Sequence, residues 1–213
     1  MRDSSCAPAV LPGMTHGKFR VLIQMRVEES RDKRMEDVTI RRAVQGDAEL
    51  LAELGANIFR DTFAEFNTVE DMAEYLSGSF SPAIQAAEIA EPDSYFLIAT
   101  IGDEPAGYAR LSFGPPPEGA RTPDRGMVRP LEIVRFYVDS RWHGRGVAAE
   151  LMRSCLAEAR REGGDLIWLA VWKENPRAIA FYRKWGFDTA GEKIFQLGSD
   201  PQTDLVMIRM VGE

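Results

Sequence analysis

The sequence has 213 residues, of which 45% are hydrophobic and 28% are charged, and its formal net charge is −7. This size and composition favour one soluble globular domain, and no run of about 18 uninterrupted apolar residues predicts a transmembrane helix. The acidic balance argues against a nucleic-acid partner. Two histidines and two cysteines without clustered ligands argue against a metal site and favour a reducing cytoplasm.

Residues 1–37 are predicted to be an extension of a single domain that spans residues 38–213. Prolines interrupt the apolar patch near the start, and the continuous apolar core of a secretory signal is missing. Residues 19–25 alternate enough for an extra strand. The segment is expected to be flexible, or to lie upstream of the natural start.

The domain is predicted to begin with a strand and a helix. Val38–Ala43 alternates as a short strand, and apolar residues at helical spacing follow it. Asp47 is the expected N-cap of this helix, which should run to about Phe66.

Two more helices and a hairpin follow. Thr68 with Asp71 resembles a capping box, and Ser81 with Pro82 combines a cap with a first-turn proline. Residues 95–113 are expected to form a hairpin around a turn at residues 102–104. The proline-rich loop over residues 114–130 should then be mobile or fold over a substrate.

The segment Leu131–Val138 is an apolar strand that contains two charged residues, Glu132 and Arg135. Strict alternation puts Glu132 on one face with Phe136 and Val138, and Arg135 on the other. A charge in such a strand is costly unless it is paired or used. We expect Arg135 to be salt-bridged to a neighbouring element. For Glu132, a salt bridge and a functional role are both open.

A basic glycine loop, residues 141–148, joins this strand to an amphipathic helix over residues 147–162. Glycines between a strand and a helix let the backbone approach a ligand and aim its free N–H groups at an anion. Arg141 and Arg145 add positive charge. The pattern predicts a phosphate or pyrophosphate site, while Cys155 on the helix reads as a small core residue.

A second buried strand and a last helix complete this region. Leu166–Trp172 is expected to run parallel to Leu131–Val138, with a right-handed crossover. Asn175 is then a helix cap followed by a proline at the first helical position. As structure alone, Asn175 is a cap and Tyr182 is a core aromatic.

The glycine loop also satisfies a dinucleotide-binding pattern, G-x-G-x-x-A from Gly144 to Ala149, with Asp165 beyond it. That pattern needs the first glycine almost directly after the strand, in a repeated βαβ fold. Here residues 139–143 intervene, and the preceding chain reads as helices and a hairpin. A nicotinamide or flavin enzyme is therefore the weaker interpretation.

Residues 134–148 and 175–187 together resemble the GCN5-related N-acetyltransferase (GNAT) superfamily. Its coenzyme A loop has the form Q/R-x-x-G-x-G/A, and its last helix commonly carries Asn, Ala, Phe-Tyr and Gly-Phe in the order seen here. The resemblance implies an α/β, mixed α+β fold. Its central sheet is mostly antiparallel, with about seven strands, a parallel pair at the cofactor site and flanking helices. His143 takes the Gln/Arg position in one register and Arg141 in another, and both registers stay open.

Segments at both ends resemble the PaiA-like branch, whose members include spermidine and spermine acetyltransferases. They are residues 62–63, 67–72, 79–81 and 196–207. The resemblance implies acetyl-CoA as cosubstrate, a small-molecule primary amine as acceptor with a polyamine favoured, and a homodimer formed through residues 193–210. An amino acid or peptide N-terminus as acceptor, and a regulator or binding module without turnover, remain alternatives.

The resemblance also implies roles for individual residues. Tyr182 would protonate the coenzyme A sulfur, and Glu132 is the candidate base, directly or through water. Backbone groups near Phe136 and Val138 would hold the pantetheine arm and the thioester carbonyl. The implied cofactor-binding residues are Phe136, Val138, Arg141, His143, Gly144, Arg145, Gly146, Val147, Ala148, Asn175 and Tyr182.

Overall fold

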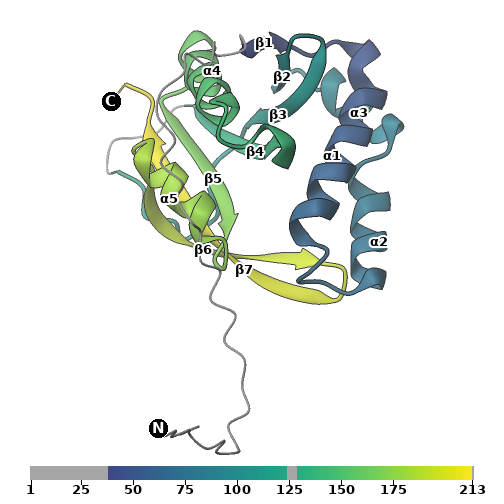
Figure 1. Ribbon diagram of the computed structural model, residues 1–213. Helices are drawn as coiled ribbons and strands as arrows, with labels where there is room; N and C mark the ends of the chain where they lie inside the picture. The colour runs from purple at the N-terminus through teal and green to yellow at the C-terminus, as the bar shows by residue number, and fades with distance from the viewer. Residues whose placement is uncertain (1–37, 124–128, 213) are drawn as a thin grey trace, which may run out of the picture. The chain divides into compact units, whose positions relative to one another are not determined.

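The computed structural model describes residues 38–123 and 129–212, which fold around one seven-stranded sheet (Figure 1). The strand order is β1-β2-β3-β4-β5-β7-β6. Among the described strands, β4 and β5 form the one parallel pair and every other neighbouring pair is antiparallel. The predicted mixed sheet is confirmed. The predicted extension over residues 1–37, with its candidate strand, lies outside the described residues.

The strands and helices follow one another along the chain largely in the order that the sequence predicts. The strands are β1 (Val38–Arg42), β2 (Ser94–Ile101), β3 (Glu104–Phe113), β4 (Pro130–Val138), β5 (Leu166–Trp172), β6 (Asp188–Leu197) and β7 (Asp200–Met210). The helices are α1 (Ala48–Phe63), α2 (Val69–Ser79), α3 (Pro82–Ala90), α4 (Val147–Arg161) and α5 (Pro176–Lys184). The first helix ends three residues before the predicted Phe66.

Three helices begin at the side chains that the sequence predicts as caps. Thr68, Ser81 and Asn175 each accept a hydrogen bond from the backbone N–H of the third helical residue. Asp47 is the N-cap residue of α1, as predicted, but its side chain makes no capping hydrogen bond to the helix. Its carboxylate instead bonds the Arg41 guanidinium at 2.7 Å, because a charged donor makes a stronger hydrogen bond than a helix N–H.

Helices cover both faces of the sheet (Figure 1). The apolar stripe of α4, together with α5, packs on one face against β2 to β5 and β7. Cys155 is fully buried in this core, and burial raises the pKa of its thiol, so it is the small core residue that the sequence predicts. The helices α1, α2 and α3 pack on the other face. Beside β5 and β7, Ala120 of the loop after β3 packs on that same face.

A β-bulge in β4 decides which of its side chains faces which helix layer. Arg110 of β3 pairs with Arg135, but the next β3 residue, Leu111, pairs with Ile133, so Val134 is an extra residue in β4. An extra residue reverses the alternation of side chains beyond it. Glu132 therefore lies on the same face as Arg135, and the predicted face sharing of Glu132 with Phe136 and Val138 is wrong.

The charged side chains on that face are held by α3. Arg135 is 9% exposed and donates to Glu88 at 2.9 Å, while its cross-strand neighbour Arg110 donates to the same carboxylate at 2.6 Å. One acidic residue of α3 thus clamps two adjacent strands. The predicted salt bridge of Arg135 to a neighbouring element is confirmed.

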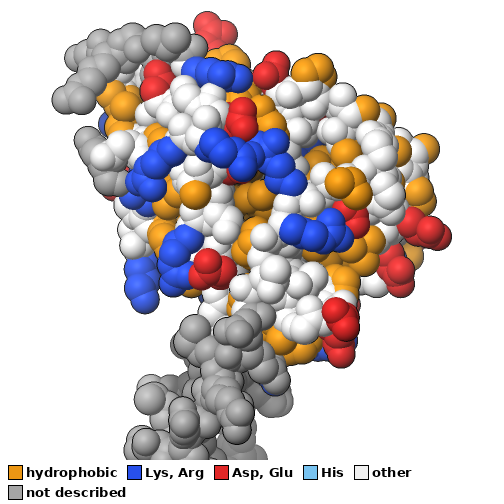
Figure 2. Space-filling model, turned by 90° about the horizontal axis from the view of Figure 1, so that it is seen from above, with side chains coloured by type: hydrophobic (Ala, Val, Ile, Leu, Met, Phe, Trp, Pro, Cys, Tyr) orange, Lys and Arg blue, Asp and Glu red, His pale blue; other side chains and the backbone are white. Residues whose placement is uncertain are grey.

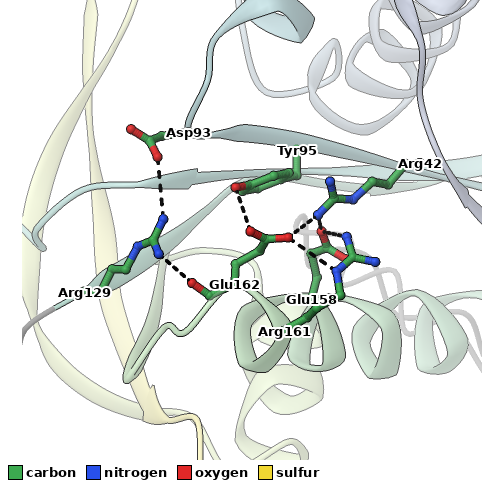
Figure 3. A network of polar contacts seen from close by, with 7 residues as sticks. All are labelled: Arg42, Asp93, Tyr95, Arg129, Glu158, Arg161 and Glu162. Carbon is green, nitrogen blue, oxygen red and sulfur yellow. Dashed lines mark hydrogen bonds and ion pairs between the residues drawn. The ribbon is translucent and has the colours of Figure 1, made fainter.

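A polar network holds the C-terminal half of α4 against β1 and β2 (Figure 3). It consists of Arg42, Asp93, Tyr95, Arg129, Glu158, Arg161 and Glu162. Glu158, only 6% exposed, is paired with Arg42. Glu162 accepts hydrogen bonds from Arg42 at 2.6 Å and from the Tyr95 hydroxyl at 3.1 Å. Because these partners come from separate elements, the network fixes the direction of α4 on the sheet.

The tip of the β6–β7 hairpin is anchored to the start of α2. Asp71 accepts a hydrogen bond from the backbone N–H of Ser199 at 2.6 Å, and Gln202 donates to Asn67 at 2.6 Å. Gly198 has a φ of +56°, and a Cβ added there would lie 2.2 Å from the Asp71 carboxylate. Both the left-handed backbone and the close approach therefore require glycine at this position. The segments that resemble the PaiA-like branch at the two ends of the chain meet here.

We predict that Gly198→Ala destabilises the protein more than the matched change Gly102→Ala. Both glycines lie in hairpin turns with nearly equal φ, +56° and +57°, but the space around Gly102 is open. The left-handed backbone alone should cost about 1 kcal/mol. Displacing Asp71 should add at least about 1 kcal/mol at Gly198. Urea unfolding of the two variants measures the difference, and equal losses of stability would contradict the anchoring contact.

Candidate active site

The sheet opens between β4 and β5. Their pairing extends from Pro130 and Leu166 to Ile133 and Leu169, whereas β4 continues to residue 138 and β5 to residue 172. On their outer edges, β4 stays paired with β3 and β5 with β7. The facing edges beyond the last pair therefore form no ladder with each other in the described sheet. Their backbone groups could bond an extended ligand that contains amides.

Aromatic residues of α5 pack beside the diverging part of β4. The ring of Tyr182 lies edge-on to Phe136 and to Phe187, with centroid distances of 6.1 and 5.9 Å. Tyr182 is 8% exposed, and burial raises the pKa of its phenol above the ordinary value. The hydroxyl therefore keeps its proton at neutral pH and can act as a proton donor.

The glycine loop leads into the N-terminus of α4. Gly144 and Gly146 have φ values of +79° and +86°, and the space above both is open. In the described chain, no side chain caps the first N–H groups of α4. These N–H groups and the helix dipole favour an anion. Val147 is buried under the loop and Ala148 is half-buried, so the backbone at this turn is both fixed and accessible. The geometry suits a pyrophosphate.

The two loop arginines have partners within the protein. Arg141 bonds Asp139, with an Nη2 to Oδ2 distance of 2.7 Å. Arg145 places its guanidinium 5.0 Å from the centre of the Trp142 ring. Both are exposed, so their charge still contributes to the positive field at the loop.

His143 and Asn175, two further predicted site residues, contact the backbone. His143 Nε2 lies 3.0 Å from the carbonyl oxygen of Val138, and a carbonyl only accepts, so this nitrogen carries the proton. The imidazole thereby ties the loop to the end of β4. Asn175 accepts a hydrogen bond from the Ala178 N–H at 3.1 Å and caps α5. Each side chain fixes the backbone beside the opening.

On the opposite face of the sheet, Glu132 lies at the base of the opening. It pairs across the parallel ladder with Trp168 and is half-buried. Burial raises the pKa of its carboxyl, against the opposing influence of Lys193 and Arg110. A carboxylate with a raised pKa is a better proton acceptor near neutral pH. Glu132 and Tyr182 thus belong to opposite faces of the sheet, beside one opening.

Asp204 of β7 shares the face of Glu132, and sequence reasoning missed it. It pairs with Trp172 of β5 and with Lys193 of β6, and it is 8% exposed. Burial raises the pKa of its carboxyl to about 6, although Lys193 lowers it. The available signal was an acidic residue directly before the apolar run 205–208 of a predicted hairpin.

Aromatic residues at the end of α1 lie over this part of the sheet. Trp172 contacts Phe66 and Phe63 at centroid distances of 5.2 and 6.1 Å. Tyr75 of α2 lies near enough for the Asp204 charge to affect its phenol. The face that carries the two carboxylates is therefore lined by aromatic rings, a setting that suits an organic cation.

Basic side chains gather elsewhere on the surface despite the net charge of −7. Figure 2 shows Lys and Arg side chains concentrated in the middle of one face, with acidic side chains among and around them. A cavity of about 590 Å³ lies between α4, α5 and β7, and its lining is Arg153, Leu156, Arg160, Lys184, Trp185, Gly186 and Arg209. The residues at the opening do not line this cavity, so it is not the candidate active site.

Two further findings concern metals and membranes. Within residues 38–123 and 129–212, no group of three or more His, Cys, Asp or Glu side chains is placed to hold a metal ion. In the same described ranges, no helix is long and apolar enough to cross a membrane.

An opening in a mixed sheet, with a buried phenol beside it and a helix N-terminus without a side-chain cap at its end, suits an elongated ligand that carries amides and phosphates. A family model described as the acetyltransferase (GNAT) family matches residues 56–187. The chain belongs to this family. It is an N-acetyltransferase that uses acetyl-CoA, and the predicted superfamily and cosubstrate are confirmed.

Known proteins of this family are similar over most of the chain. An uncharacterized N-acetyltransferase of Lactobacillus delbrueckii is 30% identical over 81% of this chain and 97% of its own length. The N-alpha-acetyltransferase RimI of Mycobacterium tuberculosis is 31% identical over 73% of this chain and 82% of its own length. The fold resembles that of the PaiA N-acetyltransferase of Thermoplasma acidophilum in complex with coenzyme A, with a TM-score of 0.64 and 18% identity over 82% and 99% of the two chains.

We predict that Asp204→Asn stabilises the free protein at neutral pH. The carboxyl pKa rises from 3.8 in the unfolded chain to about 6 on folding. At a pH below 3.8 the carboxyl is neutral in both the folded and the unfolded chain, so its burial costs no stability. As the pH rises through about 6, the buried carboxyl must ionise, and the fold loses stability. The gain should reach about 1 to 3 kcal/mol at about pH 7.5 and vanish near pH 4. Urea unfolding at both pH values tests this, with Glu192→Gln as an exposed control of equal charge change.

Proposed function

We propose that this N-acetyltransferase acetylates a primary amine of a small molecule and that a polyamine is its favoured acceptor. The observation that carries this proposal is the opening between β4 and β5, with Tyr182 on one side and Glu132 on the other. Acetyl transfer to an amine needs a proton acceptor for the ammonium and a proton donor for the departing thiolate. These two side chains are chemically suited to those tasks.

On the α5 side, Tyr182 donates its phenolic proton to the sulfur of the leaving coenzyme A. Its raised pKa keeps that proton in place until a thiolate forms. The backbone of β4 near Phe136 and Val138 holds the pantetheine arm and polarises the thioester carbonyl. The glycine loop and the first turn of α4 hold the pyrophosphate. Asn175 bonds the cofactor, while its side-chain oxygen caps α5.

On the α1 side, Glu132 takes the proton from the acceptor ammonium, directly or through one water. An amine of this kind has a pKa near 10, so it arrives charged at neutral pH. The half-buried carboxylate attracts the cation and then accepts its proton. The aromatic residues around Trp172 lie further along the same face and suit the rest of an organic cation.

The rival acceptor is an amino acid or a peptide N-terminus, and the name of the RimI relative supports it. An amino acid carries a carboxylate near its amine, which the acidic pair Glu132 and Asp204 would disfavour, and a peptide N-terminus offers one positive charge where a polyamine offers several. Charge therefore favours a polyamine. The second alternative, a regulator that binds acetyl-CoA without turnover, is disfavoured by the retained Tyr182, Asn175 and glycine loop. A thiol-release assay with polyamines, amino acids and N-terminal peptides separates all three.

Action in the cytoplasm and dimerisation through the β6–β7 hairpin also remain proposals. The outer edge of β6 has no neighbouring strand in the described sheet, and Ile194 on β6 is 64% exposed. An edge strand with an exposed apolar side chain is a suitable contact for a second copy.

We predict that Tyr182→Phe lowers kcat about 100-fold and leaves acetyl-CoA binding unchanged. Phenylalanine keeps the ring contacts with Phe136 and Phe187, so the fold should be retained. The steady-state rate of thiol release gives kcat, and calorimetry gives the affinity for acetyl-CoA. Full turnover in a folded variant would remove Tyr182 as the acid, and a wild type that fails to bind acetyl-CoA would overturn the enzymatic proposal.

We predict that Glu132→Gln abolishes the acidic limb of the pH profile of kcat and lowers the plateau about 100-fold. Burial raises the pKa of Glu132, so the ionised base appears as the pH rises through a value above its ordinary one. Glu74→Gln, on the exposed surface of α2, is the control for the charge change. An unchanged profile in Glu132→Gln would exclude this residue as the base.

A further inference from the structure

Asp204 is a largely buried carboxylate whose nearest charge influence is the ammonium of Lys193. Its side chain is 8% exposed, and within the described residues it makes no hydrogen bond or ion pair, although its oxygens are not among the fully buried atoms without a partner. Its cross-strand neighbour Lys193 places its ammonium 5.8 Å from the Trp168 ring centre, and affects Asp204 only at longer range. Leaving a buried carboxylate without a partner destabilises a fold, so a group absent from the free protein is the expected partner.

The position of Asp204 links it to the acceptor side of the opening. Asp204 pairs with Trp172, the last residue of β5. Trp172 lies beyond Leu169, in the part of β5 that is no longer paired with β4. Two residues further along β7, Val206 packs with Trp168 on the face opposite α4. Because alternate residues of a strand share a face, Asp204 is on that face too, together with Glu132.

Glu132 and Asp204 are separated along and across the sheet. Glu132 is level with Trp168 and Asp204 with Trp172, four residues further along β5, which is about 13 Å of strand. They also lie on opposite sides of β5. Two strand spacings of about 4.8 Å each across β5, together with about 13 Å along it, put their Cα atoms about 16 Å apart, and the side chains above the sheet can shorten the gap between the charged ends.

The surroundings of Asp204 select the kind of cation. Trp172 with Phe63 and Phe66 forms an aromatic wall beside it, and Tyr75 lies on the α2 side. Aromatic rings and a desolvated carboxylate favour an organic ammonium on a methylene chain over a small hydrated metal ion. In the described chain Asp204 belongs to no group of three or more His, Cys, Asp or Glu side chains that could hold a metal ion.

We propose that Asp204 holds the distal ammonium of an elongated diamine or polyamine whose reacting nitrogen lies at Glu132. This inference rests on the proposed function and makes it more specific: two carboxylates along one aromatic face select acceptors by the spacing of two positive charges. A monoamine satisfies only the first carboxylate. Lys193, whose ammonium lies 5.8 Å from the Trp168 ring centre, is repelled by the bound cation.

The experiment compares Asp204→Asn with wild type on spermidine and on n-octylamine, a monoamine with one charge on a comparable chain. The purified full chain is assayed for thiol release with saturating acetyl-CoA. Asp204→Asn should raise KM for spermidine about 10- to 100-fold, since a charged hydrogen bond is lost, and change KM for the monoamine less than about twofold. Asp204→Glu, which keeps the charge, should restore part of the spermidine affinity. Glu192→Gln, an exposed acid on β6, should leave both KM values unchanged.

Calorimetric titration of spermidine into the protein saturated with coenzyme A gives a readout independent of turnover. Binding that weakens in Asp204→Asn and not in Glu192→Gln supports the inference. Equal KM changes for both amines, or no change for either, would overturn it. A wild type that acetylates amino acids or peptides but neither binds nor acetylates spermidine would overturn the inference and leave the acetyltransferase intact. A wild type that turns over no amine and binds no spermidine would overturn the proposed acceptor as well.

Discussion

The end of pairing between β4 and β5 is the constraint on which the rest of the structure depends. Each strand keeps its outer neighbour, so the sheet remains stable while its middle opens beyond Ile133 and Leu169. The bulge at Val134 lies one residue past the last pair, where it bends the strand and reverses its side chains. Phe136 therefore faces α5 while Glu132, before the bulge, faces the opposite layer. A single extra residue thus separates the proposed donor and acceptor sides of the site.

The two sides of the opening follow different physical rules. On the α4 side, ligand binding depends on backbone: two glycines with positive φ and a helix N-terminus that no described side chain caps. On the α1 side it depends on side chains, namely two carboxylates with raised pKa values and a group of aromatic rings. The first arrangement suits a phosphorylated cosubstrate that is the same throughout the family. The second can change with the acceptor without disturbing the fold.

Structural rigidity is concentrated around, rather than at, the opening. The network of Glu158 and Glu162 fixes α4 to β1 and β2 (Figure 3). Glu88 clamps β3 and β4 through two arginines. At the other end, Asp71 and Asn67 hold the β6–β7 hairpin against α2. These contacts hold the unpaired edges of β4 and β5 and the buried Asp204 in place. The unpaired edges and Asp204 do not themselves stabilise the free protein. The contacts around the opening therefore stabilise the fold, and bound substrates would pair the groups that are left unpaired at the opening.

Local sequence determined the secondary structure, most helix caps, the glycine loop and, through the Asn175 to Phe187 pattern, the family. These features depend on neighbouring residues, on periodicity and on backbone preferences that short segments carry themselves. Only the tertiary structure decided the face of Glu132, because a bulge arises from pairing with β3 and leaves no mark on the alternation within β4. It also turned Asp47 from α1 to Arg41. Asp204 came to the site in the same way, since its place depends on the register of β7 against β5, between segments more than thirty residues apart in sequence.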